Sequence, residues 1–477
     1  MKYRLLGLFC ALFVLLDLAA TFVQYNRMVL DGDLVAIVHP SVSYAPVLHD
    51  PFGLAVLTKD SVYAAPNRFF AHLSMVGYWR AVPGWLQRAG LAPIDSVYAA
   101  QALFCTLLQA LLLYVLAVYI VGAGGLGNWR LWLAMALLAP FFQAQGYSSE
   151  MAIVPRAVTY AFFYPLPLLL LLVVARPFYR WAQGAQWHLG PLGVVGCLGL
   201  MVWLAFNGPL VPGVVAVLLL GGGMHWARSA GPPAGWASRL RQLPWVPLVL
   251  LLLFGLLCAY SLYIGRNNSE SLLPKHNVFG RYLRLPYGVF RQLTGKLGVP
   301  LLVLACLGNG YLLRRQVPAT AESQRIRQVL RVLGWFALVY ILLLPLGGYR
   351  TYRAYSLRFD TILPITLGLL FFYGLSALYL LRHLAGRARA SYAVGLVVIA
   401  CIYANADRKL RVADGNDCER AALLALGQAP AELPAVHLAQ DCNVLSWDPI
   451  TNPANSTDQA AMLQYWNITW GPRPYYH

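Results

Sequence analysis

Acidic residues are scarce in this 477-residue sequence, which has 18 Asp and Glu against 36 Lys and Arg. Charged residues of both signs make up only 11% of the chain, and hydrophobic residues make up 59%. Soluble domains carry about 25% charged and roughly 45–50% apolar residues. This balance excludes an ordinary soluble fold, and the lack of a separate basic domain argues against a nucleic-acid partner.

Cysteine pairs at metal-binding or redox spacing are also lacking. None of the eight cysteines forms a CxxC motif, and six of them lie within long apolar runs, where cysteine behaves as a small hydrophobe. The other two, Cys418 and Cys442, lie near the C-terminus, and an oxidising compartment would let them pair. The sequence therefore predicts one disulfide.

Long apolar runs are the dominant feature that is present. Runs of about 17–25 apolar residues can cross a bilayer as helices, which satisfy their own backbone hydrogen bonds. About eleven occur, near residues 4–24, 97–121, 129–145, 157–175, 189–206, 208–224, 243–265, 298–314, 330–347, 360–381 and 390–405. We therefore expect an all-α polytopic membrane protein with about eleven transmembrane helices in residues 1–405. Asn207-Gly208-Pro209 can be a turn between two spans or a kink within one.

The positive charge in short loops predicts the orientation. With a cytoplasmic N-terminus, the outer face receives residues 25–96, 146–156, 266–297, 348–359 and a small non-cytoplasmic segment, 406–477. The large first outer loop, 25–96, mixes aromatic and basic residues over 66–88, which is typical of helices on the membrane surface. Short loops and abundant arginine favour a bacterial inner membrane.

Three acids stand out on this outer face. Asp31 and Asp33, in Leu30-Asp31-Gly32-Asp33-Leu34, follow the first apolar run directly, and Glu150 lies in the second outer loop. A carboxylate at the membrane boundary is partly desolvated, which raises its pKa and makes it a better base. The alternatives are an exposed turn for the Asp pair, and a helix cap or a partner of Arg156 for Glu150.

Basic residues crowd the same face, with Arg350, Arg353 and Arg358 in one late loop. They can attract anionic head groups of membrane lipids. They can also bind a specific anion such as the phosphate of a lipid carrier, because arginine suits bidentate phosphate binding.

A first span that leads into a long outer loop with an acid pair, followed by an acid in the second outer loop, resembles the GT-C glycosyltransferases. The resemblance rests on Asp31, Asp33 and Glu150, and on the arginines of the late loop; it concerns topology and motif placement over residues 1–405. It implies an enzyme that takes a sugar from a polyprenyl-phosphate carrier and passes it to an envelope acceptor on the outer face. Asp33 or Asp31 would then be the base, and Arg350, Arg353 and Arg358 would contact the phosphate of the lipid-linked donor. It also implies that Asp33 and Arg353 line one cavity.

No cofactor is expected. His39, His49 and His72 match no zinc spacing, so we predict no protein-built metal site. A divalent cation held by Asp31, Asp33 and a lipid phosphate remains an alternative, since hard cations prefer such oxygens.

Two other classes of function stay open. A transporter or flippase would have inverted repeats and broken helices, of which Asn207-Gly208-Pro209 is one hint. A non-catalytic subunit of an envelope assembly would use the outer loops and the C-terminal segment to bind partners.

Overall fold

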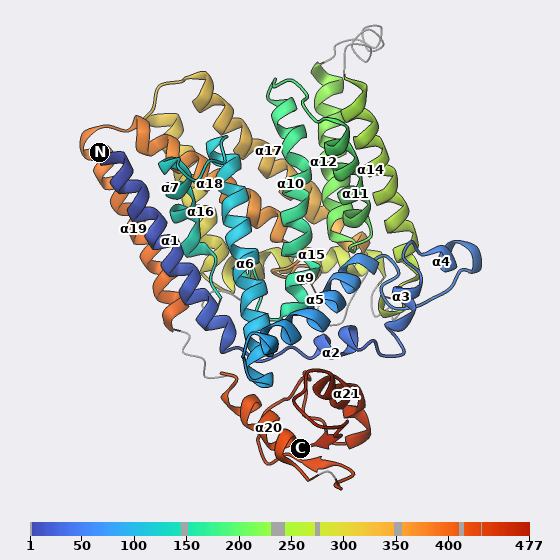
Figure 1. The fold of residues 1–477 in the computed structure, drawn as a ribbon. Helices are drawn as coiled ribbons and strands as arrows, with labels where there is room; N and C mark the ends of the chain where they lie inside the picture. The colour runs from blue at the N-terminus through green and yellow to red at the C-terminus, as the bar shows by residue number, and fades with distance from the viewer. Residues whose placement is uncertain are drawn as a thin grey trace.

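The long apolar runs form a bundle of long helices, with a small C-terminal segment at one end (Figure 1). The computed structural model describes residues 2–144, 151–229, 244–271, 277–347, 355–409, 415–430 and 432–477. Within these ranges, eight helices are long and apolar enough to span a membrane. They are α1 (Lys2–Asn26), α6 (Pro93–Val121), α9 with α10 (Val158–Phe163 and Pro165–Ala182), α12 (Leu210–Ser229), α14 (Trp245–Ile264), α17 (Ala321–Leu343), α18 (Leu363–His383) and α19 (Gly386–Lys409).

Three further apolar helices bear on the number of spans. Helix α16 (Gly298–Arg315) forms a pair with α15 (Val278–Thr294), bent by 81°, which brings the number of spans to nine if the pair counts as one. Helices α7 (Trp129–Leu138), continued by η1 (Ala139–Phe141), and α11 (Pro191–Ala205) are shorter. An all-α polytopic membrane protein is therefore confirmed, and the number eleven stays a prediction that requires α7 and α11 to cross as well.

The segment around Asn207 is a turn and does not continue one helix. The carbonyl of Phe206 accepts a hydrogen bond from the backbone N–H of Phe70, so α11 ends beside the first loop. Gly208 then has φ +110°, a conformation that favours glycine, and α12 begins at Leu210. Helix α12 runs back toward the opposite end of the bundle (Figure 1).

Helix α15 occupies a stretch that the hydropathy pattern predicts only as an outer loop, 266–297. Exposed apolar side chains recur at helical spacing, at Phe279, Leu283, Tyr287 and Phe290, between arginines. This pattern produces one apolar and one basic face, typical of a helix in the membrane interface.

The first loop folds into short helices and one long one. These are α2 (Asp33–Val38), α3 (Ala45–His49), α4 (Leu54–Lys59) and α5 (Phe69–Arg88). Helix α5 packs against α6, so the expected surface helices at 66–88 are one partly buried helix.

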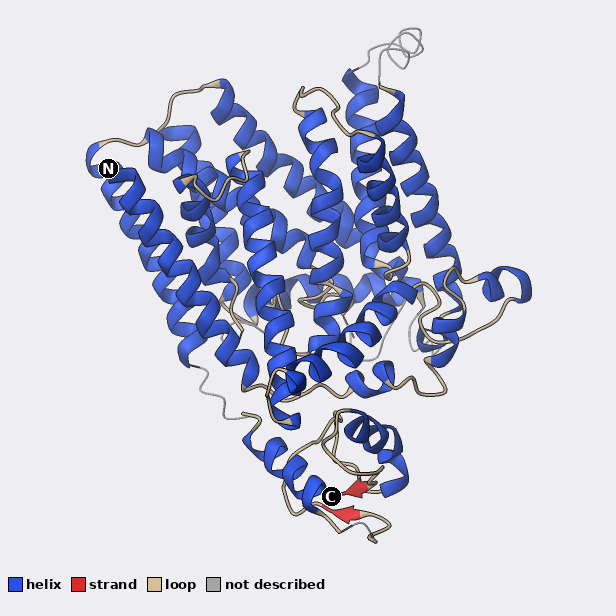
Figure 2. Ribbon diagram, in the orientation of Figure 1, coloured by secondary structure: helices blue, strands red, loops and turns tan. Residues whose placement is uncertain are grey.

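The C-terminal segment lies against this loop at the same end of the bundle (Figure 1). It contains α20 (Asp417–Gln428), η7 (Pro453–Ser456), α21 (Thr457–Tyr465) and two short parallel strands, β1 (Val436–His437) and β2 (Tyr475–Tyr476), coloured red in Figure 2. The buried Trp466 docks it: its indole donates to the carbonyl of Trp79 at 3.1 Å, and Gln87 donates to the carbonyl of Trp466 at 2.8 Å. The first loop and the C-terminal segment therefore contact each other directly at one end of the bundle.

Candidate functional site

Asp31 fixes the start of the first loop to helix α9. Its side chain is buried, and its two oxygens accept hydrogen bonds from the backbone N–H of Thr159 at 3.0 Å and the hydroxyl of Thr159 at 2.7 Å. One oxygen also accepts from the backbone N–H of Asp33 at 3.1 Å. Burial raises the pKa of Asp31 to about 6, although these hydrogen bonds oppose the rise. Asp31 thus caps the first turn of α9 from a distant segment.

Asp33 is the more accessible acid of the pair. Its side chain is partly exposed, and its Oδ1 accepts a hydrogen bond of 2.8 Å from the indole Nε1 of Trp447 in the C-terminal segment. Burial raises the pKa of Asp33, and the hydrogen bond from Trp447 partly opposes this. The negative charge of Glu270 raises the pKa as well, whereas a hydrogen bond from Tyr160 and the charge of Arg358 lower it.

Gly32 separates the two acids because there is no room for a side chain. A Cβ atom at this position would lie 2.4 Å from the backbone nitrogen of Trp447 and 2.7 Å from the carbonyl carbon of Ser446. Both neighbours are backbone atoms, so they cannot move aside as a flexible side chain would. The Asp-Gly-Asp motif therefore lets the C-terminal segment approach the site closely.

Arg358 reaches the same site from the late loop. Its guanidinium carbon lies 4.8 Å from the ring centroid of Tyr160, whose hydroxyl bonds to Asp33. The guanidinium also forms a salt bridge with the buried Asp360, with 3.0 Å between Arg358 Nε and Asp360 Oδ2. Asp360 fixes the position of Arg358, and Tyr160 links the cation to the candidate base.

A second group of polar side chains continues the site beyond Asp33. Glu270, in η4 (Ser269–Ser271), accepts a hydrogen bond of 2.5 Å from the hydroxyl of Tyr44. The ring of Tyr44 lies 5.4 Å from that of His72, and Arg68 lies over the ring of Phe163 at 5.3 Å. Burial, together with the nearby charge of Arg68, lowers the pKa of His72 to about 3, so this histidine is neutral. Arg68 adds a second cation to the site.

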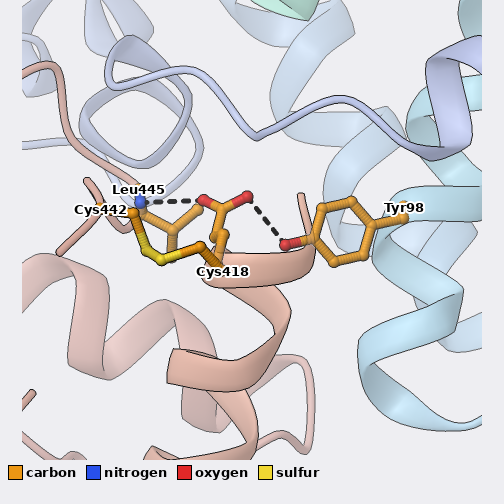
Figure 3. The surroundings of a disulfide bond; sticks show 5 residues. Tyr98, Cys418, Cys442 and Leu445 are labelled. Carbon is orange, nitrogen blue, oxygen red and sulfur yellow. Dashed lines mark hydrogen bonds between the residues drawn. A yellow bond between two sulfur atoms is a disulfide. The ribbon is translucent and has the colours of Figure 1, made fainter. Parts of the chain in front are cut away.

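The disulfide of the C-terminal segment lies beside a buried acid (Figure 3). Cys418 and Cys442 are joined, as the sequence predicts. The next residue, Glu419, accepts hydrogen bonds from the backbone N–H groups of Leu30 at 3.0 Å and Leu445 at 3.2 Å, and from the hydroxyl of Tyr98 at 2.8 Å. Burial raises the pKa of Glu419 to about 7. Glu419 thus connects the disulfide to the residue that precedes Asp31.

The predicted site residues have different outcomes. Asp33 and Arg358, which are 325 positions apart in the sequence, belong to one site. The buried Asp31 accepts a hydrogen bond from the backbone of Asp33 and so helps to position it. Glu150, Arg350 and Arg353 lie outside the described residues. The prediction that Asp33 and Arg353 line one cavity depends on Arg353 and therefore falls outside them too. Within the described ranges, no group of three or more His, Cys, Asp or Glu side chains could hold a metal ion, and His39, His49 and His72 form no such group.

Sequence reasoning missed several residues of the site. Tyr160, Trp447 and Glu270 carry no motif, and only the fold brings them to Asp33. Arg68 and His72 do lie in the aromatic and basic stretch at 66–88, but nothing in that pattern indicates that the charge of Glu270 in η4 acts on His72.

The fold and the site together define a polytopic α-helical integral membrane protein with a polar site where the first loop, the late loop and the C-terminal segment meet. No protein-family model matches the chain, and no curated protein matches it significantly.

Proposed function

We propose that the protein is a GT-C-type glycosyltransferase that transfers a sugar from a polyprenyl-phosphate carrier to an envelope acceptor. In this proposal the site faces outward from a bacterial inner membrane. The observation that carries it is that one site, at one end of the helical bundle, holds both a partly exposed carboxylate of raised pKa, Asp33, and an arginine fixed by a salt bridge, Arg358. Glycosyl transfer from a lipid phosphate needs both groups.

Asp33 is assigned as the base. The acceptor oxygen forms a bond to the anomeric carbon of the sugar, the bond from that carbon to the carrier phosphate breaks, and the acceptor proton passes to Asp33. A raised pKa favours this step, because the carboxylate then holds the proton more tightly. Asp31 is assigned a positioning role, since three donor groups already occupy its oxygens.

The cations are assigned to the departing phosphate. Arg358 is fixed by Asp360, and Arg68 lies over the ring of Phe163. A guanidinium held in place before the reaction neutralises the charge that develops on the leaving group without reorganisation. Arg350 and Arg353 belong to the same late loop, and the resemblance to the GT-C glycosyltransferases is the basis for proposing them as further phosphate contacts.

The proposal is tested with the purified protein in lipid nanodiscs. A panel of radiolabelled polyprenyl-phosphate sugars is incubated with it, and the label that remains on the carrier is separated from label in water-soluble or acceptor products. The proposal predicts protein-dependent loss of label from one carrier. Transport of a carrier or a solute across a sealed vesicle, with every carrier chemically intact, would instead favour the transporter class.

A further inference from the structure

A cavity lined by arginines lies at the end of the bundle away from Asp33. Its volume is about 530 Å³, and Arg314, Gln324, Arg327, Gln328 and Arg331 line it. We call it the arginine cavity. Helix α17 ends in η5 (Leu344–Gly347), where the carbonyl of Pro345 accepts a hydrogen bond from Arg281 of α15. The first turns of α17, which carry the cavity, therefore lie at the opposite end (Figure 1).

The arginines of the cavity converge from two helices. Arg314 is in the last turn of α16. On α17, Gln324, Arg327, Gln328 and Arg331 follow the i, i+3, i+4, i+7 pattern, which places them on one face. Among the residues that the structure describes, no acidic side chain lines the cavity. Topology alone requires positive charge at a cytoplasmic end, but it does not require three guanidinium groups around one cavity. Such convergence matches an anion with several oxygens, such as a phosphate.

Apolar surface continues from the cavity along both helices. On α17 the same face continues through Trp335, Leu338 and Leu342, all exposed. On α16 the residues in line with Arg314 are Tyr311, Leu307 and Leu304, which are exposed too. The helices approach closely here, since a Cβ on Gly310 of α16 would lie 2.9 Å from the side chain of Leu330 of α17. A ligand with an anionic head and apolar chains would therefore contact both the arginine cavity and the exposed apolar residues of α16 and α17.

We propose that the arginine cavity binds the phosphate of an anionic membrane lipid, whose acyl chains lie along the exposed apolar stripes of α16 and α17. The site is separate from the proposed transferase site and does not depend on that activity. A lipid bound here would join α16 to α17 at the membrane surface.

The test measures thermal unfolding of detergent-purified protein with added dioleoyl phosphatidylglycerol. The double variant Arg327→Gln/Arg331→Gln removes two of the three charges, and its apparent affinity for this lipid should fall roughly tenfold or more. The matched control is Arg387→Gln/Arg389→Gln, which removes the same charge from exposed positions in the first turn of α19. Its affinity should equal that of the wild type. Equal affinity in all three proteins would overturn the proposal.

A second measurement needs no variant and therefore does not depend on how the variants fold. The wild-type protein is titrated with dioleoyl phosphatidylglycerol, dioleoyl phosphatidylcholine and inorganic phosphate. Stabilisation by the first alone supports an anionic lipid. Equal stabilisation by phosphatidylcholine would show that the charge is irrelevant, and equal stabilisation by inorganic phosphate would show a free-anion site; either result overturns the lipid assignment.

Discussion

The indole Nε1 of Trp447 donates a hydrogen bond of 2.8 Å to Oδ1 of Asp33, across 414 positions of sequence. The C-terminal segment therefore contributes a side chain to the site that the first loop begins. The hydrogen bond favours the ionised carboxylate, whereas burial favours the protonated one. The pKa of the proposed base thus depends on the docking of the C-terminal segment.

Replacing Trp447 with Phe should shift the pH dependence of transfer. Without the indole N–H, the pKa of Asp33 rises further, so a higher pH is needed to ionise the base. The acidic limb of the profile of kcat/KM against pH should move to higher pH. Trp470→Phe, at a position 94% exposed, is the control and should leave the limb in place. An unchanged acidic limb in Trp447→Phe would show that this hydrogen bond does not influence the pKa of the catalytic base.

Replacing Gly32 with Ala should displace the C-terminal segment. The new methyl group would meet backbone atoms of Ser446 and Trp447, and overpacking of this kind costs about 1–3 kcal/mol. Both the free energy of unfolding and the transfer rate should fall. Gly77→Ala in α5 is the control, because a Cβ there meets nothing within 4 Å. It should be neutral or stabilise the helix by about 1 kcal/mol. Equal behaviour of the two variants would contradict this packing.

Removing the disulfide should loosen the C-terminal segment. The cysteines are 24 positions apart, and closing a loop of that size stabilises a fold by about 3 kcal/mol in the chain-entropy model. In Cys418→Ser/Cys442→Ser, hydrogen exchange should become faster in residues 432–477 and at Leu30, which is bonded to Glu419. Cys401→Ser removes an exposed free thiol and is the control. Unchanged exchange in the double variant would show that the disulfide does not stabilise the docking.

Glu419 should make the docking of the C-terminal segment sensitive to pH. Burial raises its pKa from 4.5 to about 7, so the folded state binds the proton more tightly than the unfolded state does. Its contribution to stability is therefore complete below about pH 4.5 and is lost as the pH rises toward 7. Stability of the segment, measured by hydrogen exchange, should decline over this window in the wild type. The decline should be smaller in Glu419→Gln than in the wild type. Glu432→Gln, the control in the same segment, should show the same decline as the wild type. A decline in Glu419→Gln as large as that of the wild type would show that other groups, such as Asp31, cause the pH dependence.

The sequence alone was sufficient to predict the class of fold, because membrane-spanning helices can be recognised from the composition and the length of apolar runs. The long apolar runs reappear as helices, and the Cys418–Cys442 pair was foreseeable because the other six cysteines lie in apolar runs. The sequence at Asn207-Gly208-Pro209 indicated an interruption, but it did not distinguish the observed turn from a kink within one helix. The last apolar run was expected to end near residue 405, and α19 extends to Lys409. Helix boundaries depend on local caps, which hydropathy does not report.

The site was only partly foreseeable. Asp33 is conspicuous because acids are so rare in this chain, but its contact with Trp447 depends on how a segment from the other end of the sequence docks. The different roles of Asp31 and Asp33 could not be derived either, since burial of one and partial exposure of the other result from packing against Thr159 and Trp447.

The most direct test of the proposed mechanism compares Asp33→Asn with Asp60→Asn in nanodiscs. Asp60 lies in the same loop, pairs with Arg266 at the surface and loses the same charge, so this control should transfer sugar at the wild-type rate. Both variants should bind the labelled polyprenyl-phosphate sugar as the wild type does. Transfer by Asp33→Asn should fall by roughly 10²–10⁴-fold, the usual contribution of a general base. Transfer at the wild-type rate by Asp33→Asn, with carrier binding intact, would contradict the assignment of Asp33 as the base.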